Sequence, residues 1–174
     1  TLLIFGLTTS VSAMIGAYVG GRVADRVGSM RTLKVSINMS ALILVVLTSI
    51  TPATLFFVIP VSVEPVWSFP YFNTVAELAY LATNQAFALF FVTGLSASRT
   101  LMAKLSPPAM ATQFFGLYGL SGSITAFLAP LLVAIVTDIT QSQRFGFASL
   151  VFLILGGGLM LGWVREEQAT RAAA

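Results

Sequence analysis

Uncharged apolar segments alternate with short charged or proline-rich segments along the whole chain. Five apolar segments reach roughly 20 residues, the length that an α-helix needs to cross the hydrocarbon core of a bilayer. The pattern therefore predicts an all-α integral membrane protein, with transmembrane helices at about residues 2–20, 32–50, 76–98, 113–137 and 145–164.

The segment 51–75 has a different character, because Pro52, Pro60, Pro65 and Pro70 exclude one continuous helix. Aromatic residues accumulate in it as they do at membrane–water interfaces, namely Phe56, Phe57, Trp67, Phe69, Tyr71 and Phe72. We expect an extracytoplasmic loop that lies on the membrane surface, with a short interfacial helix at 53–59.

Composition supports the membrane assignment, since 57% of the residues are hydrophobic and 9% are charged, against about 25% charged in soluble domains. The chain contains neither histidine nor cysteine, so catalysis is disfavoured and we expect no metal site and no cofactor. The net charge is +3. The basic residues lie beside apolar segments and form no patch, so this charge does not indicate a nucleic-acid surface. Because Thr1 already lies in an apolar segment, we interpret the chain as a fragment of a longer protein.

Positive charges predict the orientation, because lysine and arginine concentrate on the cytoplasmic side of membrane proteins. Five spans place 21–34, 99–112 and the C-terminal tail from Arg165 on one side. Eight of the nine lysines and arginines then lie there, and Arg144 is the exception. We expect a multi-pass protein of a bacterial cytoplasmic membrane with these three segments in the cytoplasm.

The densest group of charges follows the first predicted span and reads Gly-Arg-Val-Ala-Asp-Arg-Val-Gly-Ser-Met-Arg over 21–31. This pattern resembles the signature loop of the major facilitator superfamily, which joins the second and third helices of each six-helix half. The resemblance implies that Asp25 acts as a conformational latch against a helix end of the opposite half, where free N–H groups stabilise a carboxylate. Gly21, Arg26, Gly28 and Arg31 would complete this loop. The alternative is a plain positive-inside loop.

A narrower resemblance covers about residues 92–146 and rests on Gly94–Pro108, Gln113–Tyr118 and Ser121–Gly122. These segments are similar to the bacterial relatives of the autophagy-related fungal vacuolar amino-acid effluxers. The resemblance implies five of the six helices of a carboxy-terminal transporter half, which pairs with an N-terminal half of the same protein. The chain departs from that branch's pattern at four positions, which are Leu95, Gln113, Ser123 and Ala129.

A stripe of polar and aromatic residues on the predicted span 76–98 is the best candidate for a solute cavity. Steps of three and four residues place its members within an arc of about 100° on a helix. The members are Glu77, Tyr80, Asn84, Phe87, Phe91, Gly94 and Ser98, of which Tyr80, Asn84, Phe87 and Phe91 are the candidates for solute contact. Tyr118 and Ser121 on the span 113–137 are expected beside them. The alternative is helix packing, with Asn84 hydrogen-bonded to a neighbouring helix.

Small residues on one face of the first span indicate close helix packing, since small side chains let helix backbones approach in lipid. They are Gly6, Thr9, Ser12, Ala13, Gly16, Ala17 and Gly20. The predicted spans have no mid-membrane charge. Glu77, near the outer interface, is a candidate proton-coupling residue. The alternatives are a plain interfacial carboxylate at Glu77 and a coupling group in the missing part of the protein.

Together these features predict membrane transport of a small polar solute by alternating access, with efflux of an amino acid or related metabolite implied by the resemblance. A non-transporting membrane sensor or scaffold with the same fold is the alternative. The expected partners are the lipid bilayer, the solute and the N-terminal half.

Overall fold

The computed structural model describes residues 2–52, 54–55, 59–61, 64–68 and 71–164. Its long helices are α1 (Leu2–Val27), α2 (Ser29–Ser49), α3 (Val75–Leu105), α4 (Ala111–Thr140) and α5 (Gln143–Leu161). The short elements are β1 (Thr54–Leu55), β2 (Ile59–Pro60) and the 3₁₀-helix η1 (Pro108–Met110). The five predicted spans are confirmed as helices, and each is long and apolar enough to cross a bilayer.

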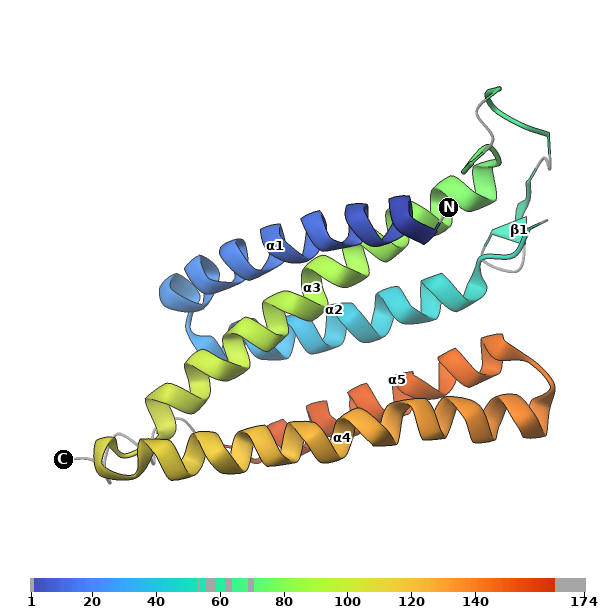
Figure 1. Cartoon of the computed structure of the whole chain (residues 1–174). Coiled ribbons are helices and arrows are strands. Elements are labelled where there is room, and N and C mark those ends of the chain that lie inside the picture. The colour runs from blue at the N-terminus through green and yellow to red at the C-terminus, as the bar shows by residue number, and fades with distance from the viewer. Residues whose placement is uncertain (1, 53, 56–58, 62–63, 69–70, 165–174) are drawn as a thin grey trace.

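Helix α3 is the central element of the bundle, because it packs against both α1 and α2. Helices α4 and α5 form a hairpin that contacts the rest mainly through α5 and α2. Figure 1 shows α3 in front of α2 and α4 in front of α5, and successive helices run in opposite directions. The first residues of α1, α3 and α5 therefore lie at one end of the bundle, together with the last residues of α2 and α4.

The contact between α1 and α3 is built on small residues of α1. Gly16, Gly20 and Ala24 are buried at intervals of four residues, which places them on one face of the helix. The Thr93 hydroxyl on α3 donates a hydrogen bond to the Gly16 carbonyl oxygen at 2.9 Å. A bond from a side chain to the backbone of another helix requires close approach, so α1 packs on α3 through this part of its small-residue face.

The core lies where α1, α2 and α3 meet. Ala24 and Ala97 are fully buried, and Met30, Leu33 and Leu101 pack around them. These residues come from one end of the three helices, close to the α1–α2 corner. The charged segment 21–31 is therefore attached directly to this core.

The prediction of a loop over 21–31 was wrong in conformation. Helix α1 continues to Val27 and α2 starts at Ser29, so Gly28 alone interrupts the helices, with φ 103° and ψ 138°. The same difference occurs at 99–105, which belongs to α3, and at Asp138, which lies inside α4. Charged residues limit the part of a helix that lies in hydrocarbon, but the backbone bonds continue into the polar layer.

The described residues of the segment 51–75 contain a short antiparallel strand pair at 54–55 and 59–60, where an interfacial helix at 53–59 was expected. Residues 53 and 56–58 of that predicted helix lie outside the described residues. Thr54 pairs with Pro60, and Leu55 pairs with Ile59, in an antiparallel arrangement. Thr51 supports the start of the hairpin, because its side chain accepts a 2.8 Å bond from the Thr54 N–H. Parts of the predicted aromatic belt lie outside the described residues, namely Phe56, Phe57 and Phe69, as does the predicted tail from Arg165.

Candidate functional site

Two adjacent amides on α3 bind two adjacent threonines on α1. The Asn84 side-chain N–H donates to the Thr9 hydroxyl at 2.9 Å, and that of Gln85 donates to the Thr8 hydroxyl at 3.0 Å. Thr9 in turn donates to the Phe5 carbonyl of its own helix at 2.7 Å. A polar side chain in a membrane bundle needs such partners, so part of the hydrogen-bonding capacity of Asn84 is used between helices.

The amide oxygens of this pair have different surroundings. Within the described residues, the Gln85 Oε1 atom is buried and accepts no hydrogen bond. The Asn84 bond to Thr9 uses only the amide nitrogen, which leaves the carbonyl oxygen as an acceptor. Asn84 is half-buried, so this oxygen belongs to a residue with a partly accessible side chain.

The aromatic members of the stripe form two separate stacks. Tyr80 stacks on Phe5 of α1 with ring centroids 6.2 Å apart and planes inclined by 24°. Phe87 and Phe91 stack on each other within α3 at 5.5 Å and 17°. Both separations lie in the range where ring pairs attract.

Tyr118 brings α4 to α3 near the other end of the stripe. Its hydroxyl lies 2.8 Å from the Ser98 hydroxyl. The Ser98 hydroxyl also lies 2.8 Å from the Leu95 carbonyl oxygen of its own helix, and either hydroxyl can be the donor in its contact with Tyr118. Ser121 is exposed and donates to the Tyr118 carbonyl of its own helix at 2.8 Å.

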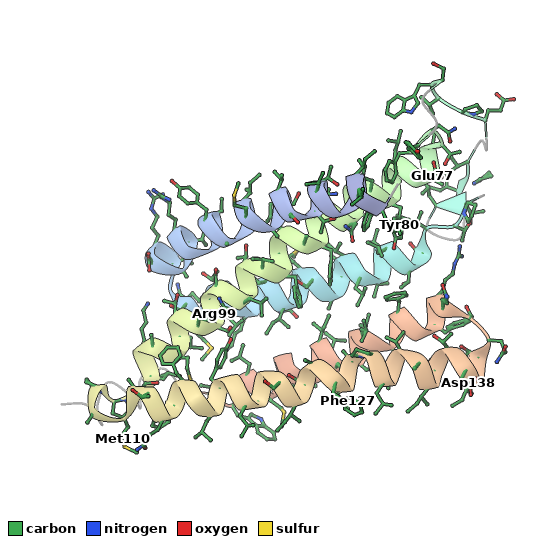
Figure 2. The ribbon with its side chains drawn as sticks, viewed as in Figure 1. Glu77, Tyr80, Arg99, Met110, Phe127 and Asp138 are labelled. Atoms are coloured by element: carbon green, nitrogen blue, oxygen red, sulfur yellow. The ribbon has the colours of Figure 1, made fainter. Side chains whose placement is uncertain are left out.

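The stripe faces two cavities instead of one. Glu77 and Tyr80 line a cavity of about 640 Å³ at the end of the bundle where α3 begins, the end at which both are labelled in Figure 2. Phe91 and Ser98 line a cavity of about 370 Å³ between α2, α3 and α5. Asn84 lines neither of these two cavities. Phe87, Tyr118 and Ser121 line neither of them either, so the candidate solute residues do not surround a single chamber.

Glu77 holds the start of α3. Its N–H donates to the Thr74 hydroxyl at 3.3 Å, while its Oε2 atom accepts from the backbone N–H groups of Asn73 at 2.9 Å and Thr74 at 3.4 Å. This reciprocal arrangement is a capping box, which satisfies N–H groups that the first helical turn leaves free. Proton coupling by Glu77 stays a prediction.

The charged residues of the latch segment point away from the core. Asp25, Arg26 and Arg31 are exposed, and Gly21 is part of α1. The guanidinium of Arg22 lies over the Tyr18 ring at 3.9 Å, a cation–π contact that holds it along α1. These positions leave Asp25 accessible to another part of the protein, and its latch role stays a prediction.

Lys104 forms a contact that the sequence analysis missed. Its ammonium group donates to the Ser29 hydroxyl at 2.9 Å, and Ser29 is fully buried directly after Gly28. The bond ties the last turn of α3 to the first residue of α2. No periodicity reports such a pair, because its members lie 75 residues apart.

Replacing Lys104 with alanine is expected to lower the stability of this corner by about 1–2 kcal/mol, because the buried Ser29 hydroxyl loses a charged partner. Lys34→Ala is the matched control, since Lys34 is an exposed lysine on the neighbouring α2. The thermal unfolding midpoint of the purified protein measures the difference. Equal midpoints for the two variants would show that the hydrogen bond from Lys104 to Ser29 does not contribute to stability.

Thr8 and Gln85 were also missed as interhelical partners. Asn84 and Gln85 are consecutive amides in an otherwise apolar stretch. Because two consecutive residues point in different directions from a helix, this pattern predicts hydrogen-bond partners on two faces of α3. Thr9 was assigned to the small-residue face of α1 and Thr8 to no face, so neither was predicted to accept a hydrogen bond from α3.

Comparison with known proteins shows to which family the chain is similar. The family described as "Vacuole effluxer Atg22 like" matches residues 1–174. The "Uncharacterized MFS-type transporter YxiO" of Bacillus subtilis (strain 168) is 36% identical over 73 residues, which are 42% of this chain and 17% of that protein. "Autophagy-related protein 22" of Cryptococcus neoformans var. neoformans serotype D (strain B-3501A) is 33% identical over 87 residues, 50% of this chain and 16% of that protein.

The matched regions cover about a sixth of the length of these relatives. No solved structure matches the chain significantly. The family match, by contrast, includes all five membrane-spanning helices and the segments between them. Because it extends over the whole sequence, this chain belongs to the Atg22-like vacuole effluxer family.

Proposed function

We propose that this chain is part of a membrane carrier that exports a small polar solute, such as an amino acid or a related metabolite, by alternating access. The observation that carries the proposal is the match of the effluxer family to every helix of the bundle. A relative described as an MFS-type transporter supports the same mechanism. In such carriers two halves rock around a site near the middle of the membrane.

The solute path in this proposal runs along α1, α3 and α4. The Asn84 carbonyl oxygen accepts a hydrogen bond from the solute, while its N–H stays on Thr9. The aromatic rings of Tyr80, Phe87 and Phe91 provide apolar and cation-binding surfaces. Tyr118 and Ser121 contribute hydroxyls from α4.

An N-terminal half of the same protein is the proposed opposite wall. Within the described chain, no residue of α4 is buried, and α1 buries only Gly16, Gly20 and Ala24. Both helices therefore have wide faces available for another half or for lipid. The exposed Asp25 and Arg26 then lie where a conformational latch is able to reach the other half, with Arg31 beside them and Gly21 and Gly28 at the ends of the segment.

The proposed orientation places 21–34, 99–112 and the C-terminal tail in the cytoplasm of a bacterial cell. The structure is compatible with this arrangement, because the α1–α2 corner, the α3–α4 connection and the end of α5 lie at one end of the bundle in Figure 1. We propose no enzymatic activity for this chain.

Substituting Asn84 with alanine is expected to slow exchange of the transported solute about tenfold, the effect of removing one buried hydrogen-bond partner. The full-length protein is reconstituted in vesicles, and exchange of a labelled mixture of the standard α-amino acids is measured. Asn38→Ala is the matched control, because Asn38 is exposed and donates only to the Lys34 carbonyl of its own helix.

Thr9→Val separates a solute contact from a packing contact, since it removes the same interhelical bond and nearly preserves side-chain shape. The proposal expects a larger loss of exchange in Asn84→Ala than in Thr9→Val. Exchange that falls equally in both variants assigns Asn84 to packing alone. Solute binding without any exchange in the unmodified protein contradicts the carrier and supports a sensor.

A further inference from the structure

The larger cavity, of about 640 Å³, lies at the end of the bundle opposite the latch segment. Its walls come from the start of α1, the end of α2, the start of α3 and the start of α5. Its volume lies within the range of about 300–1,000 Å³ that is typical of small-molecule sites. Side chains from four helices converge on it, although these helices are distant in sequence.

Most of the residues that line this cavity are apolar or aromatic. Phe5 and Tyr80 form their stack there, and Phe147 of α5 lines the cavity with them. Tyr80 is 39% exposed and Phe147 is 50% exposed. Aromatic rings that converge on a cavity and remain accessible offer a surface for an apolar ligand group.

Arg144 lines the same cavity. Its position is unfavourable for a basic residue in two respects. It lies in the first turn of α5, which begins at Gln143, where the helix dipole disfavours a cation. It is also the one basic residue that the proposed orientation leaves outside the cytoplasm. An anionic ligand group beside the guanidinium would offset both of these unfavourable effects.

Glu77 provides the opposite charge in the cavity. Its Oε2 atom is fixed by the backbone N–H groups at the start of α3, so the carboxylate is held in place, and Oε1 remains to accept from a further donor. Glu77 and Arg144 form no ion pair with each other in the described part of the chain. Both charges are consequently available to a ligand.

From this arrangement we propose that the cavity binds a zwitterion that carries an apolar group. The ammonium group of the ligand lies at Glu77, its anionic group lies at Arg144, and its apolar part lies against Phe5 and Phe147. Two exposed opposite charges that line one cavity suit a ligand that carries both, because each charge then forms a charge-assisted hydrogen bond with its own group of the ligand.

Two sources supply this chemistry at a membrane surface. One is the headgroup of phosphatidylethanolamine, which has a primary ammonium and a phosphate, with acyl chains as its apolar part. The other is a free apolar α-amino acid. Tyr80 also belongs to the proposed solute path, so the test rests on Glu77 and Arg144 and measures binding instead of transport. Failure of this site therefore leaves the proposed carrier function untouched.

Thermal unfolding of the purified full-length protein in detergent tests the site. The probes are short-chain phosphatidylethanolamine, phosphatidylcholine and phosphatidylglycerol, and L-phenylalanine. We expect phosphatidylethanolamine or phenylalanine to raise Tm by about 2–4 °C at saturation, and the responding probe identifies the source. Phosphatidylcholine lacks an N–H donor and phosphatidylglycerol lacks an ammonium, so both are expected to give a much smaller shift.

Charge-neutral variants complete the test. Glu77→Gln and Arg144→Gln are each expected to remove the Tm shift, while Asp138→Asn and Arg99→Gln are expected to keep it. Asp138 is a carboxylate at the same end of the bundle as Glu77, and Arg99 lies toward the opposite end (Figure 2). The proposal is overturned if neither zwitterion stabilises the protein, if phosphatidylglycerol stabilises it equally well, or if the shift persists in both Glu77→Gln and Arg144→Gln.

Discussion

Replacing Gly16 with leucine is expected to disrupt the packing of α1 on α3 and to leave little correctly folded protein. A Cβ atom at this position would clash with the backbone carbonyl oxygen of Leu89, and a backbone atom in a helix cannot move aside as a flexible side chain does. Even Gly16→Ala is expected to destabilise the bundle by about 1–3 kcal/mol through this overpacking.

Gly6→Leu is the matched control on the same helix, because no atom lies within 4 Å of a Cβ atom added there. Gly20→Ala provides a second position on the packed face, where the added Cβ atom would lie 2.8 Å from the Cα atom of Thr93. The yield of monodisperse protein and the thermal unfolding midpoint measure the effect. If Gly6→Leu and Gly16→Leu behave alike, α1 does not pack on α3 through its glycines.

The second large effect is expected at Gly28, the residue between α1 and α2. Its φ of 103° and ψ of 138° lie in a region that residues with a Cβ atom rarely occupy. The Cβ atom of Gly28→Ala would meet no neighbour within 4 Å, so the expected destabilisation of about 1–3 kcal/mol comes from backbone strain alone. The change is also expected to shift the charged latch segment, which Gly28 joins to α2.

Gly21→Ala isolates the backbone effect at Gly28. Gly21 lies in the same segment, has equally open space around its Cα atom, and is helical. Alanine is favoured over glycine in a helix by about 1 kcal/mol, so this variant is expected to be as stable as the unmodified protein or slightly more stable. Denaturant unfolding compares the two substitutions. A Gly28→Ala protein with unchanged stability is incompatible with the backbone described for this corner.

The sequence contained most of the fold, because the physical cause of each spanning helix is local. Length, hydropathy and the absence of charge act within one segment, and they predicted all five helices. Helix ends were predicted less well, since charge marks the limit of the hydrocarbon layer and not the limit of the backbone bonds. Residues 21–27 show this directly, because they contain Arg22, Asp25 and Arg26 and are nevertheless helical.

The candidate site was less accessible to sequence reasoning. Periodicity placed Asn84 on a defined face of its helix, but it does not say which helix faces it. The bond to Thr9, and the contact of Tyr118 with Ser98, both depend on how α1 and α4 pack against α3. The pairing of β1 with β2 was not predicted for a related reason. A strand of two residues is too short to show an alternating sequence pattern and depends on its partner strand.

The central claim, that one side of this bundle faces a path for a polar solute, is tested most directly by thiol accessibility. The chain contains no cysteine, so single cysteines at Ser121 and Ser123 change one atom each, at exposed positions of α4 whose hydroxyls bond only within that helix. In the full-length protein in vesicles, with other cysteines removed, a membrane-impermeant thiol reagent is expected to modify Ser121→Cys. An α-amino acid mixture is expected to slow this reaction, while Ser123→Cys, on a different face of α4, does not respond to the mixture. A Ser121→Cys protein that is unreactive, or that reacts at the same rate with and without the mixture, would contradict the proposed path.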